Sequence, residues 1–201
     1  MRTGLLGGTF DPPHNAHVAI ALAAIEAAGL DSVEFMPSGV PPHKVRSRLS
    51  PVADRLAMAR LAALSDPRLG VCEAEVHSQD MCYTLNTWRT LVQRRRGEEL
   101  YLVLGGDCVR DLPKWFRFAD LVREANFVIL NRPGMDAVAL ARQLPLPCDL
   151  VEKLAASVVP GPLVDISSTL VRGCITRHEP ITGLVPSGVA AYIAEKNLYR
   201  E

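Results

Sequence analysis

Short apolar segments alternate with longer segments of helical periodicity along the whole chain, and this alternation constrains the fold more than any other feature. The segments expected to contain strands are residues 3–8, 32–36, 68–74, 100–104, 127–130 and 150–159. The segments expected to be helical are residues 15–29, 50–64, 84–96, 135–144, 167–174 and 187–196. Strands that alternate with helices through short connections favour a Rossmann-like, doubly wound α/β fold, in which helices cover both faces of a mostly parallel sheet.

Neither an internal repeat nor a linker interrupts the 201 residues, so a single domain over residues 1–201 is expected. In a sheet of this kind, ligands bind beyond the carboxyl ends of the strands. The polar segments that fall at those ends are residues 7–17, 37–44, 105–107 and 131–132. These segments are therefore the candidates for a binding site, whereas residues 136–162 show no pattern that indicates chemistry.

Composition excludes several classes of protein. The formal net charge is zero, which gives no support for a general attraction to nucleic acid or to a membrane surface. The five cysteines are widely spaced without a Cys-x-x-Cys pair, which argues against both a disulfide framework and a zinc site. The N-terminus does not have the pattern of a signal peptide, and no apolar run approaches the roughly 20 residues of a membrane span. A cytoplasmic protein is therefore expected.

Residues 7–17 carry the most informative pattern. Two glycines after the first strand allow a ligand to approach the backbone, and the helix that follows presents its positive end to an anion. His14 and His17 are three residues apart at that end, so both imidazoles can donate hydrogen bonds to the same phosphate group. A single histidine there would more often be a helix cap or a surface residue, but the pair after a glycine turn favours phosphate chemistry. The segment is neither a dinucleotide fingerprint nor a Walker loop.

Gly-Gly-Thr-Phe-Asp-Pro-x-His-x-x-His, at residues 7–17, resembles the T/HxGH motif of the nucleotidyltransferase superfamily. Its longer form is similar to that of the bacterial nicotinate-nucleotide adenylyltransferases. The resemblance implies that His14 and His17 contact the phosphates of ATP, and that the nucleotide is also held by Gly7, Gly8, Thr9 and Phe10. Ala16 stands where the family usually has glycine, and because alanine is small and favours helices, the motif is expected to be retained.

Two further segments resemble parts of the same family. Residues 41–44 resemble its Pro-His-Lys loop, which implies that Lys44 reaches the phosphates, although alone this would be a solvated basic loop. Residues 82–87 resemble its Ser-Tyr-Thr-x-x-Thr segment, with Cys82 in place of serine. The resemblance places Tyr83 and Thr84 at the nicotinate, with its carboxylate on the Thr84 amide. Free amides and the helix dipole both favour a carboxylate there, but an ordinary helix start capped by Thr84 is compatible with the same residues.

Residues 105–115 resemble the family's Gly-x-Asp…Leu-x-x-Trp pattern. Gly105 and Asp107 follow an apolar strand, where a carboxylate can accept hydrogen bonds from ribose hydroxyls. Trp115 can stack on a pyridine ring, although a core position for this tryptophan is equally compatible with its chemistry. Arg132 has the right charge for a substrate phosphate, but it could also be a surface turn residue.

Residues 166–172 resemble the family's Ile-Ser-Ser-Thr-x-Ile/Val-Arg segment. Hydroxyl residues at a helix start, with an arginine one turn later, can place several donors on one anion. The resemblance implies that this segment binds the β- and γ-phosphates of ATP through Ile166, Ser167, Ser168, Thr169 and Arg172.

Together these matches imply an adenylyl transfer from ATP to nicotinate mononucleotide, which gives nicotinic acid adenine dinucleotide and pyrophosphate. A direct in-line attack is expected because no covalent nucleophile is evident, and phosphoryl transfer needs mainly positioning and charge neutralisation. The residues expected to neutralise charge are His14, His17, Lys44 and Arg172. Mg²⁺ is expected to be held mainly by ATP oxygens rather than by protein ligands.

Three alternatives stay open from the sequence. The acceptor could instead be nicotinamide mononucleotide or pantetheine phosphate, although the 82–84 segment and Trp115 favour a pyridine carboxylate. A non-catalytic nucleotide sensor would not need to keep both histidines, Lys44 and Arg172, which this chain does keep. A nucleic-acid-binding module is disfavoured by the zero net charge. The oligomeric state is not determined by the sequence, and a homodimer is possible.

Overall fold

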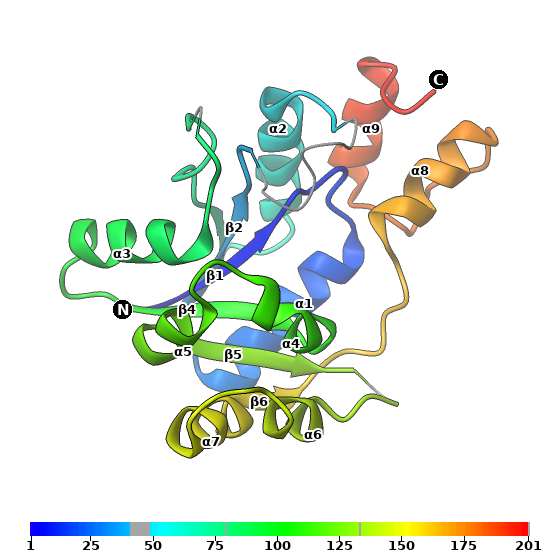
Figure 1. Cartoon of the computed structure of the whole chain (residues 1–201). Helices are drawn as coiled ribbons and strands as arrows, with labels where there is room; N and C mark the ends of the chain where they lie inside the picture. The colour runs from blue at the N-terminus through cyan, green and yellow to red at the C-terminus, as the bar shows by residue number, and fades with distance from the viewer. Residues whose placement is uncertain (41–48, 79, 133, 201) are drawn as a thin grey trace.

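A computed structural model describes residues 1–40, 49–78, 80–132 and 134–200 of the chain. Its centre is a six-stranded, entirely parallel sheet with the strand order β3-β2-β1-β4-β5-β6 (Figure 1). The strands are β1 (Arg2–Gly8), β2 (Ser32–Pro37), β3 (Leu69–Val71), β4 (Glu99–Gly105), β5 (Asn126–Asn131) and β6 (Val158–Pro160). This is the doubly wound order, and the predicted Rossmann-like α/β fold is confirmed.

Helices cover both faces of the sheet, and each face has its own apolar core. One face is covered by α3 (Thr84–Arg94), α4 (Asp107–Asp111), the 3-10 helix η1 (Leu112–Lys114), α5 (Phe118–Glu124), α6 (Ala137–Arg142) and α7 (Cys148–Ala156). The other face is covered by α1 (Asn15–Ala28), α2 (Val52–Ala63), α8 (Ser168–Thr176) and α9 (Ser187–Glu195). Leu5 and Leu6 of β1 illustrate the alternation, because they are neighbours in sequence but belong to the two different cores.

β1 and β4 lie side by side in the middle of the sheet, and the strand order reverses between them. β2 and β3 follow on the side of β1, and β5 and β6 follow on the side of β4. At such a switch point the connections leave in opposite directions and open a crevice at the carboxyl ends of the strands. The segments that enter this crevice are the turn after Gly8 and the start of α4 at Asp107. The fold therefore brings two of the predicted polar segments to one place.

The helix that follows β1 begins at Asn15, where the sequence predicts it. His14, rather than Asn15, occupies the N-cap position of α1, while the Asn15 side chain donates a hydrogen bond to the Gly183 carbonyl at 2.8 Å. The predicted end of the helix is confirmed, because Gly29 adopts a left-handed backbone with φ of 60°. As the N-cap residue, His14 lies at the entrance of α1.

The largest error lies in the segment 150–159, which was predicted to hold a strand. Residues 148–156 form α7, which buries Leu150, Val151, Leu154 and Ala155 at helical spacing, and only Val158–Pro160 form β6. The short helices α4 and α5 were not predicted, and β3 is shorter than the segment 68–74.

No helix in the described ranges combines the length and the apolar character that crossing a membrane requires. All five cysteines are free thiols, as predicted.

Candidate active site

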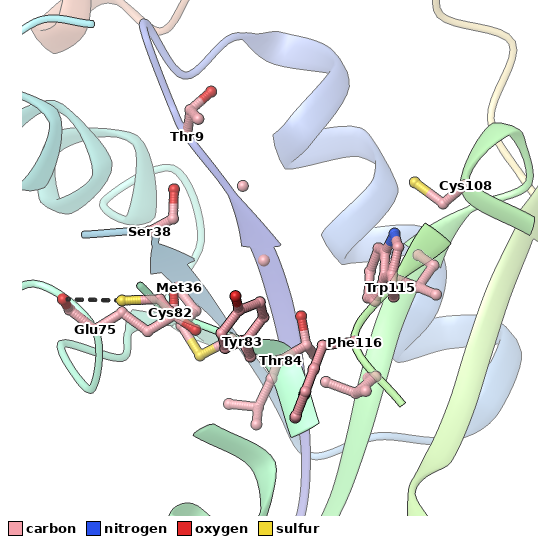
Figure 2. A pocket seen from close by; sticks show the side chains of 15 residues that line it. Thr9, Met36, Ser38, Glu75, Cys82, Tyr83, Thr84, Cys108, Trp115 and Phe116 are labelled. Atoms are coloured by element: carbon pink, nitrogen blue, oxygen red, sulfur yellow. Dashed lines mark hydrogen bonds between the residues drawn. The ribbon is translucent and has the colours of Figure 1, made fainter. Parts of the chain in front are cut away.

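A cavity of about 300 Å³ opens at the carboxyl edge of the sheet, between the ends of β1, β2 and β4 and the start of α3. Figure 2 shows its walls, which include Thr9 and Ser38 on one side and Trp115 on the other. The cavity collects several predicted residues from distant parts of the sequence: Gly7, Gly8, Thr9, Tyr83, Thr84 and Trp115. The sheet edge therefore gathers the glycine turn and the predicted pyridine-binding residues around one space.

Aromatic side chains form one wall of this cavity. Tyr83 is the N-cap residue of α3, and its ring meets that of Phe116 with centroids 4.6 Å apart. Trp115, which is half-buried, follows η1 and lines the cavity beside Phe116. Phe116 was not among the predicted site residues, and its position next to Trp115 is the signal that could have identified it. Flat apolar walls of this kind suit a planar ring.

Thr84 is the first residue of α3, as predicted, so its backbone amide lies in the first turn, where amides have no acceptor within the helix. Because Tyr83 is the N-cap residue of α3, the alternative in which Thr84 caps the helix is excluded. Glu75 lies beneath this helix start at 5% exposure, and its carboxylate accepts a hydrogen bond from Thr87 Oγ1 at 2.7 Å. Burial raises the pKa of Glu75. Glu75 was missed because no sequence pattern distinguishes it from a surface acid.

The two histidines lie against each other at the entrance of α1. Their ring centroids are 3.8 Å apart in a stacked arrangement, and the His14 backbone amide donates a hydrogen bond to His17 Nδ1 at 3.2 Å. Because Nδ1 of His17 is an acceptor, the neutral ring carries its proton on Nε2. Phe10 is buried beneath His17, with ring centroids 4.8 Å apart, so that Phe10 can offer a ligand only its backbone. This packing fixes the direction of the His17 ring.

His14 is 6% exposed, and its Nδ1 is buried without a hydrogen-bond partner among the described residues. Burial lowers the pKa of His14 to about 4, and the positive charge of Arg132 acts in the same direction. The ring is therefore neutral at pH 7. Since buried polar atoms are nearly always paired in folded proteins, the unpaired nitrogen indicates a position prepared for a further partner.

This burial predicts a pH dependence of stability. An unfolded histidine has a pKa of about 6.5, so between about pH 6.5 and pH 4 the unfolded chain binds a proton at this position that the folded chain does not. The contribution of His14 to the free energy of unfolding should therefore be complete above pH 6.5 and fall by up to about 3 kcal/mol towards pH 4. Urea unfolding at a series of pH values measures this slope.

The matched variant is His14→Gln, which keeps a polar side chain but does not titrate. For each protein the free energy of unfolding is plotted against pH. The slope for the wild-type protein minus the slope for the variant isolates His14 from the carboxylates that titrate in the same range. Identical slopes for the two proteins would show that His14 titrates normally in the folded state.

Asp107 and Arg132 face each other across the ends of β4 and β5, where Arg132 Nε lies 3.3 Å from the Asp107 carboxylate. Both residues are partly exposed, so breaking their ion pair to form contacts with a ligand costs little free energy. A second, shallower cavity of about 390 Å³ lies next to Arg132, beyond the ends of β5 and β6, with Met135 and Gly161 in its walls. Arg132 therefore stands between His14 and an open space at the sheet edge.

The start of α8 is fastened to the turn after β1. Ser168 Oγ donates to the Pro12 carbonyl at 2.9 Å, and Arg172 Nη1 donates to the Asp11 carbonyl at 2.7 Å. Arg172 Nη2 also donates to Thr169 Oγ1 at 3.2 Å. Ser167 is the N-cap residue, with its Oγ accepting a hydrogen bond from the Leu170 amide. These contacts place the predicted 166–172 segment next to the histidine-bearing turn, as expected.

Buried hydrogen bonds that sequence reasoning did not predict support the same turn. Asp11 is 2% exposed, and its carboxylate accepts hydrogen bonds from the Tyr199 hydroxyl at 2.6 Å and from the Ser50 amide at 3.3 Å. Arg55 of α2 is also 2% exposed and donates hydrogen bonds to carbonyls of neighbouring loops. The hydrogen-bond partners of Asp11 and Arg55 are distant in sequence or are backbone atoms, so no sequence motif predicts these contacts.

Lys44 lies outside the described residues, as does the rest of the predicted Pro-His-Lys segment. Within the described ranges, no cluster of three or more His, Cys, Asp or Glu side chains has the arrangement of a metal site.

Comparisons with known proteins agree with this geometry. Residues 5–173 match the family model described as cytidylyltransferase-like. The chain is 38% identical over 200 residues to a probable nicotinate-nucleotide adenylyltransferase of Halalkalibacterium halodurans, covering 99% of this chain and 91% of the relative. It is 40% identical to the protein of the same name from Herpetosiphon aurantiacus, covering 98% of both chains.

A solved structure supports the fold. The Plasmodium falciparum nicotinic acid mononucleotide adenylyltransferase complexed with NaAD superposes with a TM-score of 0.76 at 20% identity, covering 98% of this chain and 97% of that one.

Proposed function

The chain belongs to the nicotinate-nucleotide adenylyltransferase family, and from that membership we propose that its paired histidines and the adjoining cavity bring ATP and nicotinate mononucleotide together for direct in-line transfer. It is a nucleotidyltransferase of NAD biosynthesis, and ATP is its co-substrate. The observation that carries the proposed site is the position of the stacked histidines just beyond β1, on the turn whose Gly7, Gly8 and Thr9 line the cavity and whose Pro12 carbonyl accepts a hydrogen bond from Ser168 of α8.

The proposed step is a single displacement at phosphorus. A phosphate oxygen of nicotinate mononucleotide attacks the α-phosphorus of ATP, and the new P–O bond forms as the bond from that phosphorus to the bridging oxygen breaks. The electrons of the broken bond leave with pyrophosphate. Such a transition state needs mainly positioning and neutralisation of negative charge.

The described residues can supply both requirements. We assign the Nε2–H of His17, whose Nδ1 accepts the His14 amide, to the phosphoryl oxygens, together with the neutral ring of His14. Arg172, with the amides and hydroxyls of Ser167, Ser168 and Thr169, is assigned to the β- and γ-phosphates. Lys44 is proposed to add charge there from the sequence resemblance alone. Mg²⁺ is proposed to arrive with ATP, on phosphate oxygens and water.

The two ends of the product are assigned to different parts of the edge. Tyr83, Trp115 and the Thr84 amide would hold the nicotinate ring and its carboxylate. Gly105 and Asp107 would hold the adenosine side, with Asp107 at the ribose hydroxyls, and Arg132, which pairs with Asp107, would hold the substrate phosphate. We further propose that residues 1–201 act as one domain, and that the enzyme is cytoplasmic, which suits its five free thiols.

The test of the function is incubation with MgATP and nicotinate mononucleotide, followed by separation of the dinucleotide and measurement of pyrophosphate. Nicotinamide mononucleotide and pantetheine phosphate serve as competing acceptors, and we expect the nicotinate compound to be preferred. A stronger preference for either competitor would overturn the assignment of the cavity to a pyridine carboxylate.

The in-line mechanism has a separate test. With ATP that carries sulfur in place of one α-phosphate oxygen and is a single stereoisomer, one displacement must invert the configuration at phosphorus. Inversion in the isolated dinucleotide is expected, whereas retention would indicate a covalent enzyme intermediate.

A further inference from the structure

Arg55 is a buried cation that none of the predicted motifs includes. It lies on α2 at 2% exposure and uses its guanidinium to donate four hydrogen bonds, all of them to backbone carbonyls. The acceptors are Thr9 at 2.9 Å, Ser38 at 2.7 Å, Gly39 at 3.2 Å and Ser50 at 3.1 Å. Burial lowers the pKa of Arg55, although the negative charge of Asp11 opposes this effect. A charge is costly to bury, so these bonds must stabilise a specific arrangement.

The four carbonyls belong to three separate segments at the active edge of the sheet. Thr9 follows β1, Ser38 and Gly39 follow β2, and Ser50 precedes α2. Thr9 and Ser38 both line the cavity (Figure 2). One planar guanidinium therefore sets the distance between the nucleotide-binding turn after β1 and the loop after β2.

The loop after β2 is held on its other side without Arg55. A side chain at Gly39 would place its Cβ only 2.2 Å from the Glu75 carbonyl oxygen, so the two backbones are in direct contact. The Cys82 amide also donates to the Val40 carbonyl at 3.1 Å. Through these contacts the loop is joined to the segment that leads into Tyr83 and Thr84, independently of the guanidinium.

We propose that Arg55 is a positioning residue that keeps the turn after β1 in register with the pyridine side of the cavity. This inference rests on the proposed function, because it concerns the alignment of the two substrates. Misplacing reacting groups by about 1 Å can lower a rate by about 10²-fold. Loss of Arg55 should therefore impair the chemical step more than the binding of nicotinate mononucleotide, whose proposed contacts are on α3 and beside η1.

The test uses the full-length protein with Arg55→Lys, which keeps the charge but loses the planar fork. We expect kcat to fall by about 10-fold or more. The dissociation constant of nicotinate mononucleotide, followed by the fluorescence of Trp115 at the cavity, should change by less than about 3-fold. A variant Arg55→Gln removes the charge and keeps two donors. It should show the same loss of kcat with little change in the dissociation constant, and it provides a second protein in case lysine is poorly accommodated.

The matched control is Arg95→Lys. Arg95 is partly buried and makes a bidentate ion pair with Glu34, at 2.7 Å and 3.0 Å, but neither residue lines the cavity. This variant should lower the melting temperature and leave kcat unchanged, with every rate measured well below each protein's melting temperature. If Arg55 variants lose stability but keep kcat, as the Arg95 variant does, the inference is wrong. If the wild-type protein forms no dinucleotide, it is the proposed function that fails.

Discussion

Replacing His17 with alanine is expected to lower kcat by about 10²-fold or more, with a much smaller change in the KM of either substrate. The reason is that His17 offers a preset donor: its Nδ1 is occupied by the His14 amide, so Nε2 carries the proton, and Phe10 packs against the ring. A donor held in this way stabilises charge that develops in the transition state and binds the ground state weakly. Steady-state kinetics with MgATP and nicotinate mononucleotide measure both constants.

Two controls separate this effect from loss of the helix entrance. His17→Gln keeps an N–H near the Nε2 position and should recover part of the lost rate, while either substitution removes the acceptor of the His14 amide and costs about 1 kcal/mol of stability. His77→Ala removes an exposed histidine that does not line the cavity and should leave both constants unchanged. An unaltered kcat in His17→Ala would contradict a transition-state role for this residue.

The fold was largely predictable because most of its strand residues are apolar. Segments such as 100–104 and 127–130 have no charged residue and are followed by glycine or asparagine, and a parallel sheet buried on both sides produces that pattern. The segment 150–159 failed for the same reason. Leu150, Val151 and Leu154 form one buried helical face, but Val158 and Val159 follow so closely that the run appeared to be one strand. Helix α5, with only seven residues, is too short for its periodicity to be evident.

The position of the candidate site was predictable where its residues belong to motifs. Both histidines, Trp115 and the serines of α8 lie at the expected edge, because each belongs to a motif next to a strand end or a helix start. The buried hydrogen bonds that support the turn after β1 were not predictable. Tyr199 bonds to Asp11 across 188 positions of sequence, and Arg55 binds carbonyls that are present in every residue. Such contacts depend on the completed fold, so a local pattern cannot contain them.

Arg172→Ala is expected to lower kcat/KM for ATP by about 10²-fold, which corresponds to about 2.7 kcal/mol and falls within the usual cost of removing one member of a charged pair. Arg172 donates to the Asp11 carbonyl and to Thr169, so its guanidinium is already oriented beside the turn that carries the histidines. We propose that it adds bonds to the terminal phosphates from this position. The KM for nicotinate mononucleotide should change little, because the pyridine side of the cavity lies on α3 and beside η1.

Helix α8 offers a matched comparison for this prediction. Arg177 follows at the C-terminal end of the same helix, but it forms an exposed ion pair with Glu179 at 2.7 Å, so Arg177→Ala removes an equal charge away from the site. A rate loss in both variants would mean that ATP responds to the general positive charge of the helix. A loss confined to Arg172, recovered only in part by Arg172→Lys, would mean that the forked geometry matters, because lysine supplies the charge without the second parallel donor. Equal kcat/KM values for wild-type protein and Arg172→Ala would exclude Arg172 from the triphosphate site and leave it the structural task of joining α8 to the turn after β1.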